Sequence, residues 1–553
     1  MPDPTTRSEP VGPTAAATGR AATGADVTPA TGGDGTARVH LVDLALLALG
    51  TILLRIPAFL SSRHLTFDDG VFASSVIAMR EGGLPFRDVF SSQGPLFLPL
   101  AYLGDLLGFR TIDSPRVLAV VSGVVVVLGL YWCATRLTDR TGALVAGVVA
   151  ATSGCLMWVT APLAADGPAL AFAVLALGLA LDLRHRPTMW RAVLLGLCVG
   201  ATLSTKAMEA PILAPVVLVL LAPLADAARH RRLDSAALWR AVASGAAAAL
   251  LFLAVSLPFG FADVWDQSFN YRTDAAVDRD VWGNAAKILS TLWDRDLVLY
   301  LALALTLVCA LVAHRRTGSA RIAVVEQDAS WWSRRPWSAA GGTADTDDPP
   351  HSHYGDDGWT PSGRLLVTSW TVVTLLWMVL VVSPLWRPHV SAVVPPLVLM
   401  VALYRPPLRP TLVLGVLCLP LLVVQLDGLL APGDYSGSEA EVVAALRELP
   451  EGAWVLSDEP GLVWRAGLRT TDDLVDPSML RVQQGRYTEQ SLAEAASDPR
   501  VCAVVVRSDE RFGAFPGLGD RLAEQGYEVV GSWTPRSGDA QRLYVRSDCD
   551  PTG

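Results

Sequence analysis

The chain has 553 residues, of which 51% are hydrophobic, and its formal net charge is −9. Its mean hydropathy is +0.38, and long apolar runs alternate with short charged connectors, a pattern that excludes an ordinary soluble enzyme. No basic run falls on a soluble segment, so nucleic-acid binding is not expected. In chain order, residues 1–38 come first; they are rich in Ala, Thr, Gly and Pro, and we expect a disordered cytoplasmic N-terminus.

About eleven apolar stretches approach the ~20 residues that a helix needs to cross a bilayer. They predict a polytopic α-helical membrane protein with a transmembrane domain over residues 39–428. No cleavage site follows the first stretch, which we therefore expect to be a retained anchor. The pair 192–205 and 207–224 is also compatible with one bent element. The stretches lie near 43–60, 116–136, 142–160, 168–184, 192–205, 207–224, 241–258, 297–313, 365–383, 391–404 and 411–428.

The distribution of basic residues predicts which connectors face the cytoplasm. Cytoplasmic connectors carry an excess of Lys and Arg. For this multi-pass cell-membrane protein, the rule predicts that the N-terminus lies in the cytoplasm. It also predicts that the first long loop and the C-terminal tail lie outside the cell. The basic connectors contain Arg136 and Arg140, Arg184 to Arg191, Arg229 to Arg232, Arg315 and Arg316, and Arg405 and Arg409.

Three long connectors have distinct compositions. The first outer loop, 61–115, contains two apolar stretches that we interpret as interfacial helices: Val71 to Glu81, which ends at Gly82-Gly83, and Pro95 to Phe109. The outer loop 259–296 is rich in aromatic residues, which favour the membrane interface. The polar segment 314–364 is predicted to be a disordered cytoplasmic insert, and its histidines His351 and His353 are better explained as solvated loop residues than as metal ligands.

Residues 429–553 lose the apolar character and predict a small α/β domain outside the membrane. Its two cysteines, Cys502 and Cys549, could form a disulfide, although two unpaired thiols explain the sequence equally well. No phosphate-binding loop and no Cys/His zinc spacing occur. The expected elements are a helix over 439–449 with Ser438 as possible N-cap, strands at 454–456 and 501–506, a helix near 518–525 and strands at 527–533 and 541–546.

Three aspartates are the first candidates for chemistry. Asp68 and Asp69 stand just beyond the first apolar stretch, where a carboxylate can deprotonate a hydroxyl or hold a divalent cation. An ordinary helix N-cap explains them equally well. Asp166 lies in Ala165-Asp166-Gly167-Pro168, on the same predicted side of the membrane. A tight turn explains that motif, while two acidic sites on one face could share an acceptor or a cation.

Several cations are expected on that same face. Lys206 and Lys287 are the only lysines, which makes Lys206 an outlier in a chain that otherwise uses Arg, and an ammonium suits a phosphate. A snorkelling lysine with Glu209 as its ion partner is the alternative. His389, Arg55 and Arg272 add positive charge; Arg55 could also snorkel, and Arg272 could be a solvated loop residue. Acids beside cations suit the transfer of a group from a lipid phosphate to a hydroxyl.

The stretch from Asp68 to Phe97 resembles the first outer loop of the C-type glycosyltransferases, which include protein O-mannosyltransferases and lipid A aminoarabinose transferases. That loop typically reads Asp-Glu, an apolar helix, "gGlpyrD" and a Pro-Leu-Phe segment. Here it reads Asp68-Asp69, "VFASSVIAMREGGLPFRDVF" and Gly94-Pro95-Leu96-Phe97, with Asp69 in place of the usual Glu. Weaker similarities follow at Ala165 to Pro168, at Lys206 to Pro211 and at His389 to Leu397, so the resemblance covers about 40–430.

The resemblance implies an inverting transfer of a sugar from a polyprenyl-phosphate donor to an extracytoplasmic glycan, lipid or protein. It implies Asp68 as the base, with Asp69 and Asp166 positioning the acceptor or a divalent cation. Arg55, Lys206, Arg272 and His389 would bind the donor phosphate. A flippase for lipid-linked sugars is the alternative, since charges in a membrane domain also mark transport paths. The clustering of these charges on one side and the lack of matching broken segments argue against it. A scaffold that holds a partner through its tail is a third possibility.

Overall fold

The computed structural model describes residues 32–273, 280–317, 361–404, 408–533 and 541–549. Helix α1 (Gly32–Phe59) begins inside the segment predicted to be disordered. Likewise α14 (Leu297–Thr317) and α15 (Gly363–Leu380) extend into both ends of the predicted insert. The rest of these two segments, with His351 and His353, lies outside the described residues.

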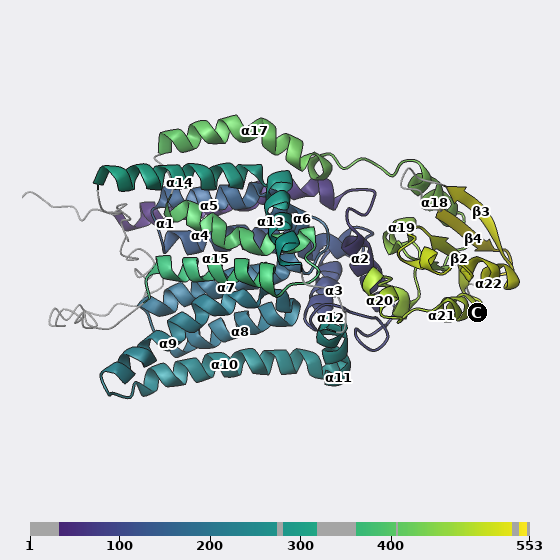
Figure 1. The fold of residues 1–553 in the computed structure, drawn as a ribbon, viewed down its shortest axis with the longest axis horizontal. Coiled ribbons are helices and arrows are strands. Elements are labelled where there is room, and N and C mark those ends of the chain that lie inside the picture. The colour runs from purple at the N-terminus through teal and green to yellow at the C-terminus, as the bar shows by residue number, and fades with distance from the viewer. Residues whose placement is uncertain (1–31, 274–279, 318–360, 405–407, 534–540, 550–553) are drawn as a thin grey trace, which may run out of the picture.

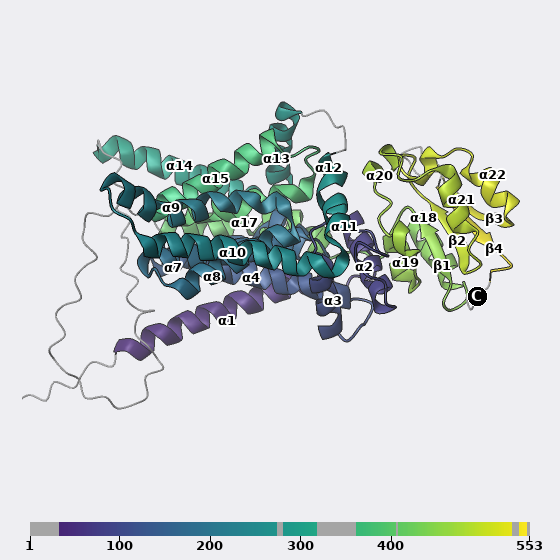
Figure 2. The ribbon, with the colours of Figure 1, turned by 90° about the horizontal axis from the view of Figure 1, so that it is seen from below.

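Long helices lie side by side and form one bundle (Figures 1 and 2). Every stretch predicted as a membrane span coincides with one of them or with a helix pair. Besides α1, α14 and α15, the bundle contains α4 (Val117–Thr135), α5 (Arg140–Thr152), α6 (Gly154–Thr160), α7 (Asp166–His185), α8 (Met189–Thr205), α9 (Leu213–Arg229), α10 (Ser235–Ser256), α16 (Val394–Leu403) and α17 (Leu408–Leu430).

Fewer helices than the eleven predicted spans are long enough to cross a membrane. Within the described ranges, seven helices are long and apolar enough to span a bilayer, or eight if the bent pair α5–α6 is one span. This pair bends by 59° at Ser153, which leaves the helical conformation and caps α6 by accepting a hydrogen bond from Leu156 N. Three further apolar helical stretches, Met189–Thr205, Leu297–Cys309 and Arg387–Leu403, are shorter. The chain is thus a polytopic helical membrane protein, and the count of eleven stays a prediction.

Helices α8 and α9 are separate elements. The helical hydrogen bonding of α8 ends at Thr205, Lys206 adopts an extended conformation, and the 3-10 helix η2 (Ala207–Ile212) leads into α9. Two glycines on one face of α8, Gly196 and Gly200, let it approach α10 closely, because a Cβ atom at Gly196 would lie only 2.0 Å from the Ser244 carbonyl oxygen. The alternative of one bent element is therefore wrong, and Lys206 stands at a break.

One end of the bundle is covered by short helices (Figure 1). The first loop forms α2 (Phe67–Arg80) and α3 (Phe97–Leu107), close to the predicted helices, followed by η1 (Ser114–Arg116). The second loop forms η3 (Leu257–Phe259), α11 (Phe261–Trp265), the π-helical turn η4 (Asp266–Asn270), α12 (Tyr271–Thr273) and α13 (Val281–Arg295). The 3-10 helix η5 (Arg387–Val393) precedes α16.

The C-terminal residues form a four-stranded sheet with the order β1-β2-β4-β3, in which only β1 and β2 pair in parallel. Alternating side chains of β2 pack into two apolar clusters: Val504 and Val506 into one, Ala503 and Val505 into the other. The strands are β1 (Trp454–Ser457), β2 (Val501–Val506), β3 (Tyr527–Trp533) and β4 (Gln541–Arg546), and the helices are α18 (Ser438–Arg447), α19 (Pro460–Ala466), η6 (Asp472–Leu474), α20 (Met479–Gln483), α21 (Glu489–Ala496), η7 (Phe512–Ala514) and α22 (Leu518–Glu524).

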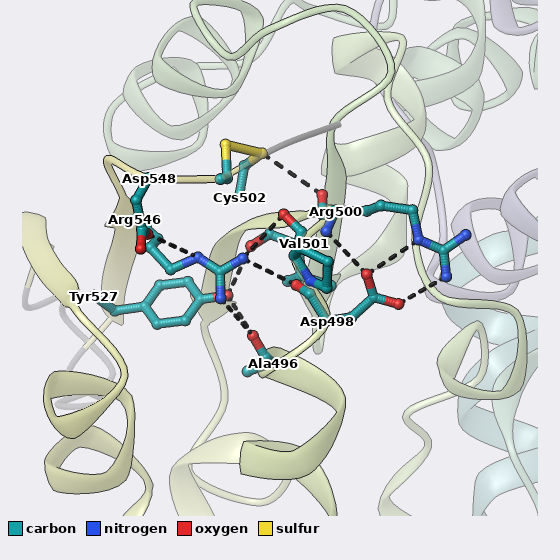
Figure 3. Close-up of a disulfide and its surroundings, with 10 residues drawn as sticks. Ala496, Asp498, Arg500, Val501, Cys502, Tyr527, Arg546 and Asp548 are labelled. Atoms are coloured by element: carbon teal, nitrogen blue, oxygen red, sulfur yellow. Dashed lines mark hydrogen bonds and ion pairs between the residues drawn. A yellow bond between two sulfur atoms is a disulfide. The ribbon is translucent and has the colours of Figure 1, made fainter. Parts of the chain in front are cut away.

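All four predicted strands are present, whereas α19, α20 and α21 were not predicted from the sequence. Ser438 is the first helical residue, and Gly437 precedes it as the N-cap. Cys502 and Cys549 form a disulfide with their Cα atoms 5.1 Å apart (Figure 3). Beside it, the Arg546 guanidinium donates hydrogen bonds to the carbonyls of Ala496, Asp498 and Pro499, so the chain end is fixed to the start of β2.

Candidate active site

The two first-loop aspartates lie in the first turn of α2 and have opposite environments. Thr66 is the N-cap, because its hydroxyl accepts a hydrogen bond from Asp69 N. Asp69 is fully buried and its carboxylate binds the Arg116 guanidinium through two hydrogen bonds of 3.1 and 2.5 Å. Backbone N–H groups of Leu65 and Leu163 donate to the same carboxylate. Both Asp69 oxygens are therefore engaged within the protein.

Asp68 is half-buried, and no described residue donates a hydrogen bond to its carboxylate. Burial raises its pKa to about 6, although the charges of Lys206 and Arg272 act in the opposite direction. The negative charges of Asp166 and Asp476 contribute to the increase. A carboxylate with this pKa and without a protein partner is suited to accept a proton near neutral pH.

Lys206 and Asp166 form a buried ion pair. The Lys206 ammonium donates to Asp166 Oδ2 over 2.7 Å, while Asp166 Oδ1 has no partner among the described residues. Asp166 is the first residue of α7, and Lys206 lies at the break after α8, so the pair joins two bundle helices at the end where Asp68 lies. The two alternatives for Lys206 are wrong: it is buried instead of snorkelling, and its ion partner is Asp166 instead of Glu209.

Arg272 and His389 belong to the same electrostatic cluster. The positive charges of Lys206 and Arg272 interact electrostatically with both His389 and Asp68. Arg272 is half-buried and donates to the Ser92 carbonyl of the first loop over 3.3 Å. His389 is buried in η5, and its Nδ1 accepts a hydrogen bond from Trp386 N, which leaves Nε2 as the position for a ligand contact.

Arg55 does not join this cluster. Its guanidinium donates to Thr160 Oγ1 and to the carbonyls of Thr51 and Ala151, and it is not among the main charges that act on Asp68. Arg55 is completely buried, so the snorkelling alternative is also wrong. The structure thus brings together Asp68, Asp166, Lys206, Arg272 and His389, whereas Asp69 and Arg55 are bound elsewhere.

The C-terminal domain contributes to the site, which the sequence did not predict. The negative charge of Asp476 interacts electrostatically with Asp68, and Ser478 forms a 2.8 Å hydrogen bond with the Tyr271 hydroxyl. Gln484 donates to the Tyr271 carbonyl over 2.6 Å. A cavity of about 140 Å³ lies between the loops and this domain, lined by Phe90, Asp266, Gln267, Tyr271, Arg481 and Arg486. Asp476 stands far from Asp68 in the sequence, and no local motif marked it.

Within the part of the chain that the structure describes, no three His, Cys, Asp or Glu side chains are placed to hold a metal ion. Of the cluster's two aspartates, Asp166 is paired with Lys206, and the neighbouring Asp69 outside the cluster is paired with Arg116. Asp68 is thus the one unpaired carboxylate of the three among the described residues, and one carboxylate beside Lys206 and Arg272 does not fit a divalent cation.

Comparisons with known proteins agree with this architecture. The family described as dolichyl-phosphate-mannose-protein mannosyltransferase matches residues 93–259. The structure of ArnT from Cupriavidus metallidurans bound to undecaprenyl phosphate matches with a TM-score of 0.54 and 13% identity over 95% of this chain and 100% of that chain. The apo structure of the same ArnT matches with a TM-score of 0.53 and 12% identity over 92% and 98%. No curated protein sequence matches.

The protein therefore has the fold of a C-type membrane glycosyltransferase, and the resemblance inferred from the first-loop motif is confirmed. The segment that matches the mannosyltransferase family runs from Gln93 in the first loop to Phe259 after α10. It includes Asp166 and Lys206, while Asp68 precedes it.

Proposed function

We propose that the protein transfers a sugar from a polyprenyl-phosphate donor to a hydroxyl of a cell-envelope glycan, lipid or protein at the outer face of the cell membrane. The observation that carries this proposal is Asp68: a carboxylate without a protein partner and with a raised pKa, beside Lys206 and Arg272. The undecaprenyl phosphate bound by ArnT, which shares the fold, supports a polyprenyl phosphate as donor.

In the proposed reaction, Asp68 accepts the proton of the acceptor hydroxyl, and the oxygen of that hydroxyl attacks the anomeric carbon of the donor sugar. The bond between that carbon and the phosphate oxygen breaks with inversion, and polyprenyl phosphate leaves. Lys206, Arg272 and His389 would stabilise the charge that develops on the phosphate. Asp166 would hold the Lys206 ammonium, and Asp69 would fix the first turn of α2 to Arg116.

The direct test compares sugar transfer from a radiolabelled polyprenyl-phosphate donor by membranes that carry the wild type or Asp68→Asn. Loss of a general base typically lowers the rate by about 10²–10⁴-fold. Asp263→Asn is a matched control, because Asp263 is exposed on α11 at the same end of the bundle. Equal transfer by the wild type and Asp68→Asn would rule out Asp68 as the base. No transfer by either, together with movement of the donor across the bilayer, would favour a flippase.

A further inference from the structure

Two buried side chains, one in η2 and one in the first loop, have polar atoms without a partner among the described residues. Glu209 is 3% exposed and its Oε1 has no hydrogen bond to any described residue. Gln93 is 8% exposed and its Oε1 is likewise unpartnered. Most buried polar atoms in proteins are hydrogen-bonded, so such exceptions often mark the contacts of a ligand.

Backbone contacts place both residues in the part of the chain that holds Lys206. Glu209 N donates to the Lys206 carbonyl over 3.2 Å, and the charges of Asp166 and Lys206 act on the Glu209 carboxyl. Gln93 precedes Gly94, whose N–H donates to the Thr205 carbonyl over 3.1 Å. A Cβ atom at Gly94 would lie 2.1 Å from the Ser204 carbonyl oxygen, so the glycine is what allows this close contact between the first loop and the end of α8.

Glu209 is not explained as a counter-ion. The Lys206 ammonium is already paired with Asp166 Oδ2, and no ion pair of Glu209 occurs among the described residues. The unpartnered Glu209 Oε1 is a hydrogen-bond acceptor, and phosphate oxygens are acceptors too, so they offer it no donor. Carboxyl and amide oxygens do accept hydrogen bonds from hydroxyl groups. In the proposed donor the sugar is bonded directly to the phosphate, so its hydroxyls must lie beside the residues that bind that phosphate.

We propose that Glu209 and Gln93 bind the hydroxyl groups of the donor sugar and thereby distinguish the sugar-bearing lipid from the polyprenyl phosphate that is released. This inference rests on the proposed function. The two oxygens contribute acceptors from η2 and from the first loop, which is joined to the end of α8 by the hydrogen bond from Gly94 N to the Thr205 carbonyl. Release of the sugar would remove these contacts and leave only the contacts to the phosphate.

The test measures binding of two kinds of lipid to the full-length enzyme in lipid nanodiscs. One probe is undecaprenyl phosphate, and the others are undecaprenyl phosphate carrying mannose, glucose or arabinose. The variants are Glu209→Gln, Glu209→Ala and Gln93→Ala, and the control is Met208→Leu in the same 3-10 helix. We expect Glu209→Ala to weaken binding of the preferred sugar-bearing lipid about tenfold or more, and Glu209→Gln to weaken it less because the amide keeps an acceptor.

Undecaprenyl phosphate should bind to all variants within about twofold of the wild type, which also shows that they are folded. Equal weakening for both kinds of lipid would overturn the inference, because it would indicate a structural role or a contact to the phosphate. Unchanged binding of the sugar-bearing lipids would overturn it as well. A wild type that binds neither kind of lipid would instead contradict the proposed function itself.

Discussion

At the scale of single residues, the neighbours Asp68 and Asp69 have separate tasks although they are chemically identical. Asp69 is saturated by Arg116 and two backbone N–H groups, whereas Asp68 has no donor among the described residues. Helix geometry explains the difference, because successive residues in the first turn of α2 point in directions about 100° apart. One carboxylate therefore points into the core and the other toward the charged cluster.

This contrast predicts that only one of two conservative substitutions lowers the stability of the protein. Asp69→Asn leaves the buried Arg116 without its counter-charge and should destabilise the protein by about 3–5 kcal/mol. Asp68→Asn should not destabilise it at pH 7.5: the folded-state pKa of Asp68 is raised to about 6, so its charged form costs stability above that pH. Thermal unfolding of both purified variants in detergent measures this. Equal melting temperatures of the two variants would contradict the assignment.

The charge of Asp476 predicts a pH effect on activity. The reaction needs deprotonated Asp68, so kcat/KM should fall as the pH decreases through about 6, the raised pKa of Asp68. Asp476→Asn removes a negative charge that raises this pKa, and the acid limb of the profile should therefore move to lower pH. Asp520→Asn, at an exposed position on α22 of the same domain, is the control. An unchanged profile for Asp476→Asn would show that Asp476 does not act on the base.

At the scale of elements, α19 of the C-terminal domain is docked on α2 directly behind the site. The centroid of the Trp464 ring lies 4.9 Å from the guanidinium carbon of Arg116 and 3.9 Å from that of Arg465. Its Nε1 donates to the Ile112 carbonyl, and Arg465 pairs with Asp113 over 2.6 Å. Because Arg116 also binds Asp69, the same residue connects the soluble domain to the first turn of α2.

The closest approach of these helices is between two glycines. A Cβ atom at Gly70 would lie 2.5 Å from Gly461 N, so Gly70→Ala must push the helices apart. We expect a loss of about 1–3 kcal/mol in docking and increased protease cleavage in the connector 431–437. Limited proteolysis measures this, and Gly433→Ala is the control, because a Cβ atom at Gly433 meets nothing within 4 Å. Equal cleavage rates of the two variants would contradict a docked interface.

At the scale of the whole molecule, α2, which carries Asp68, lies at the end of the bundle that faces the C-terminal domain (Figures 1 and 2). The domain carries a disulfide, and disulfides persist in oxidising compartments outside the cytoplasm. Both observations support an outer location for the site and the domain. The cavity at Tyr271 and Arg481 is lined by residues of the loops and of the C-terminal domain, and under the proposed function it would be open to an acceptor from the cell envelope.

This arrangement predicts the membrane topology. Alkaline phosphatase, which is active only after export, should be active when fused after Gly553 and inactive when inserted after Leu233 in the α9–α10 connector. The enzyme activity of intact cells expressing each fusion, normalised to expression, measures this. A fluorescent protein that folds only in the cytoplasm should give the opposite result at the two positions. Activity at both positions or at neither would contradict the predicted orientation.

The sequence by itself determined the bundle helices, the four strands and the fold class. Membrane helices and strands are recognisable because hydrophobic periodicity is a local property, and the loop from Asp68 to Phe97 keeps its motif within a short segment. Lys206 was recognisable as an outlier of composition. The bend at Ser153 was not predicted, because its cause is a single side-chain cap inside an apolar run.

Only the tertiary structure decided which charges meet. In the folded chain, Lys206 pairs with Asp166 instead of the nearby Glu209, and Asp69 pairs with Arg116. Arg55 donates to Thr160 away from the cluster. The fold also brings Asp476 of the C-terminal domain to Asp68. The physical reason is that a buried charge is stabilised by the nearest partner in space, and helix packing fixes that distance between residues far apart in the chain.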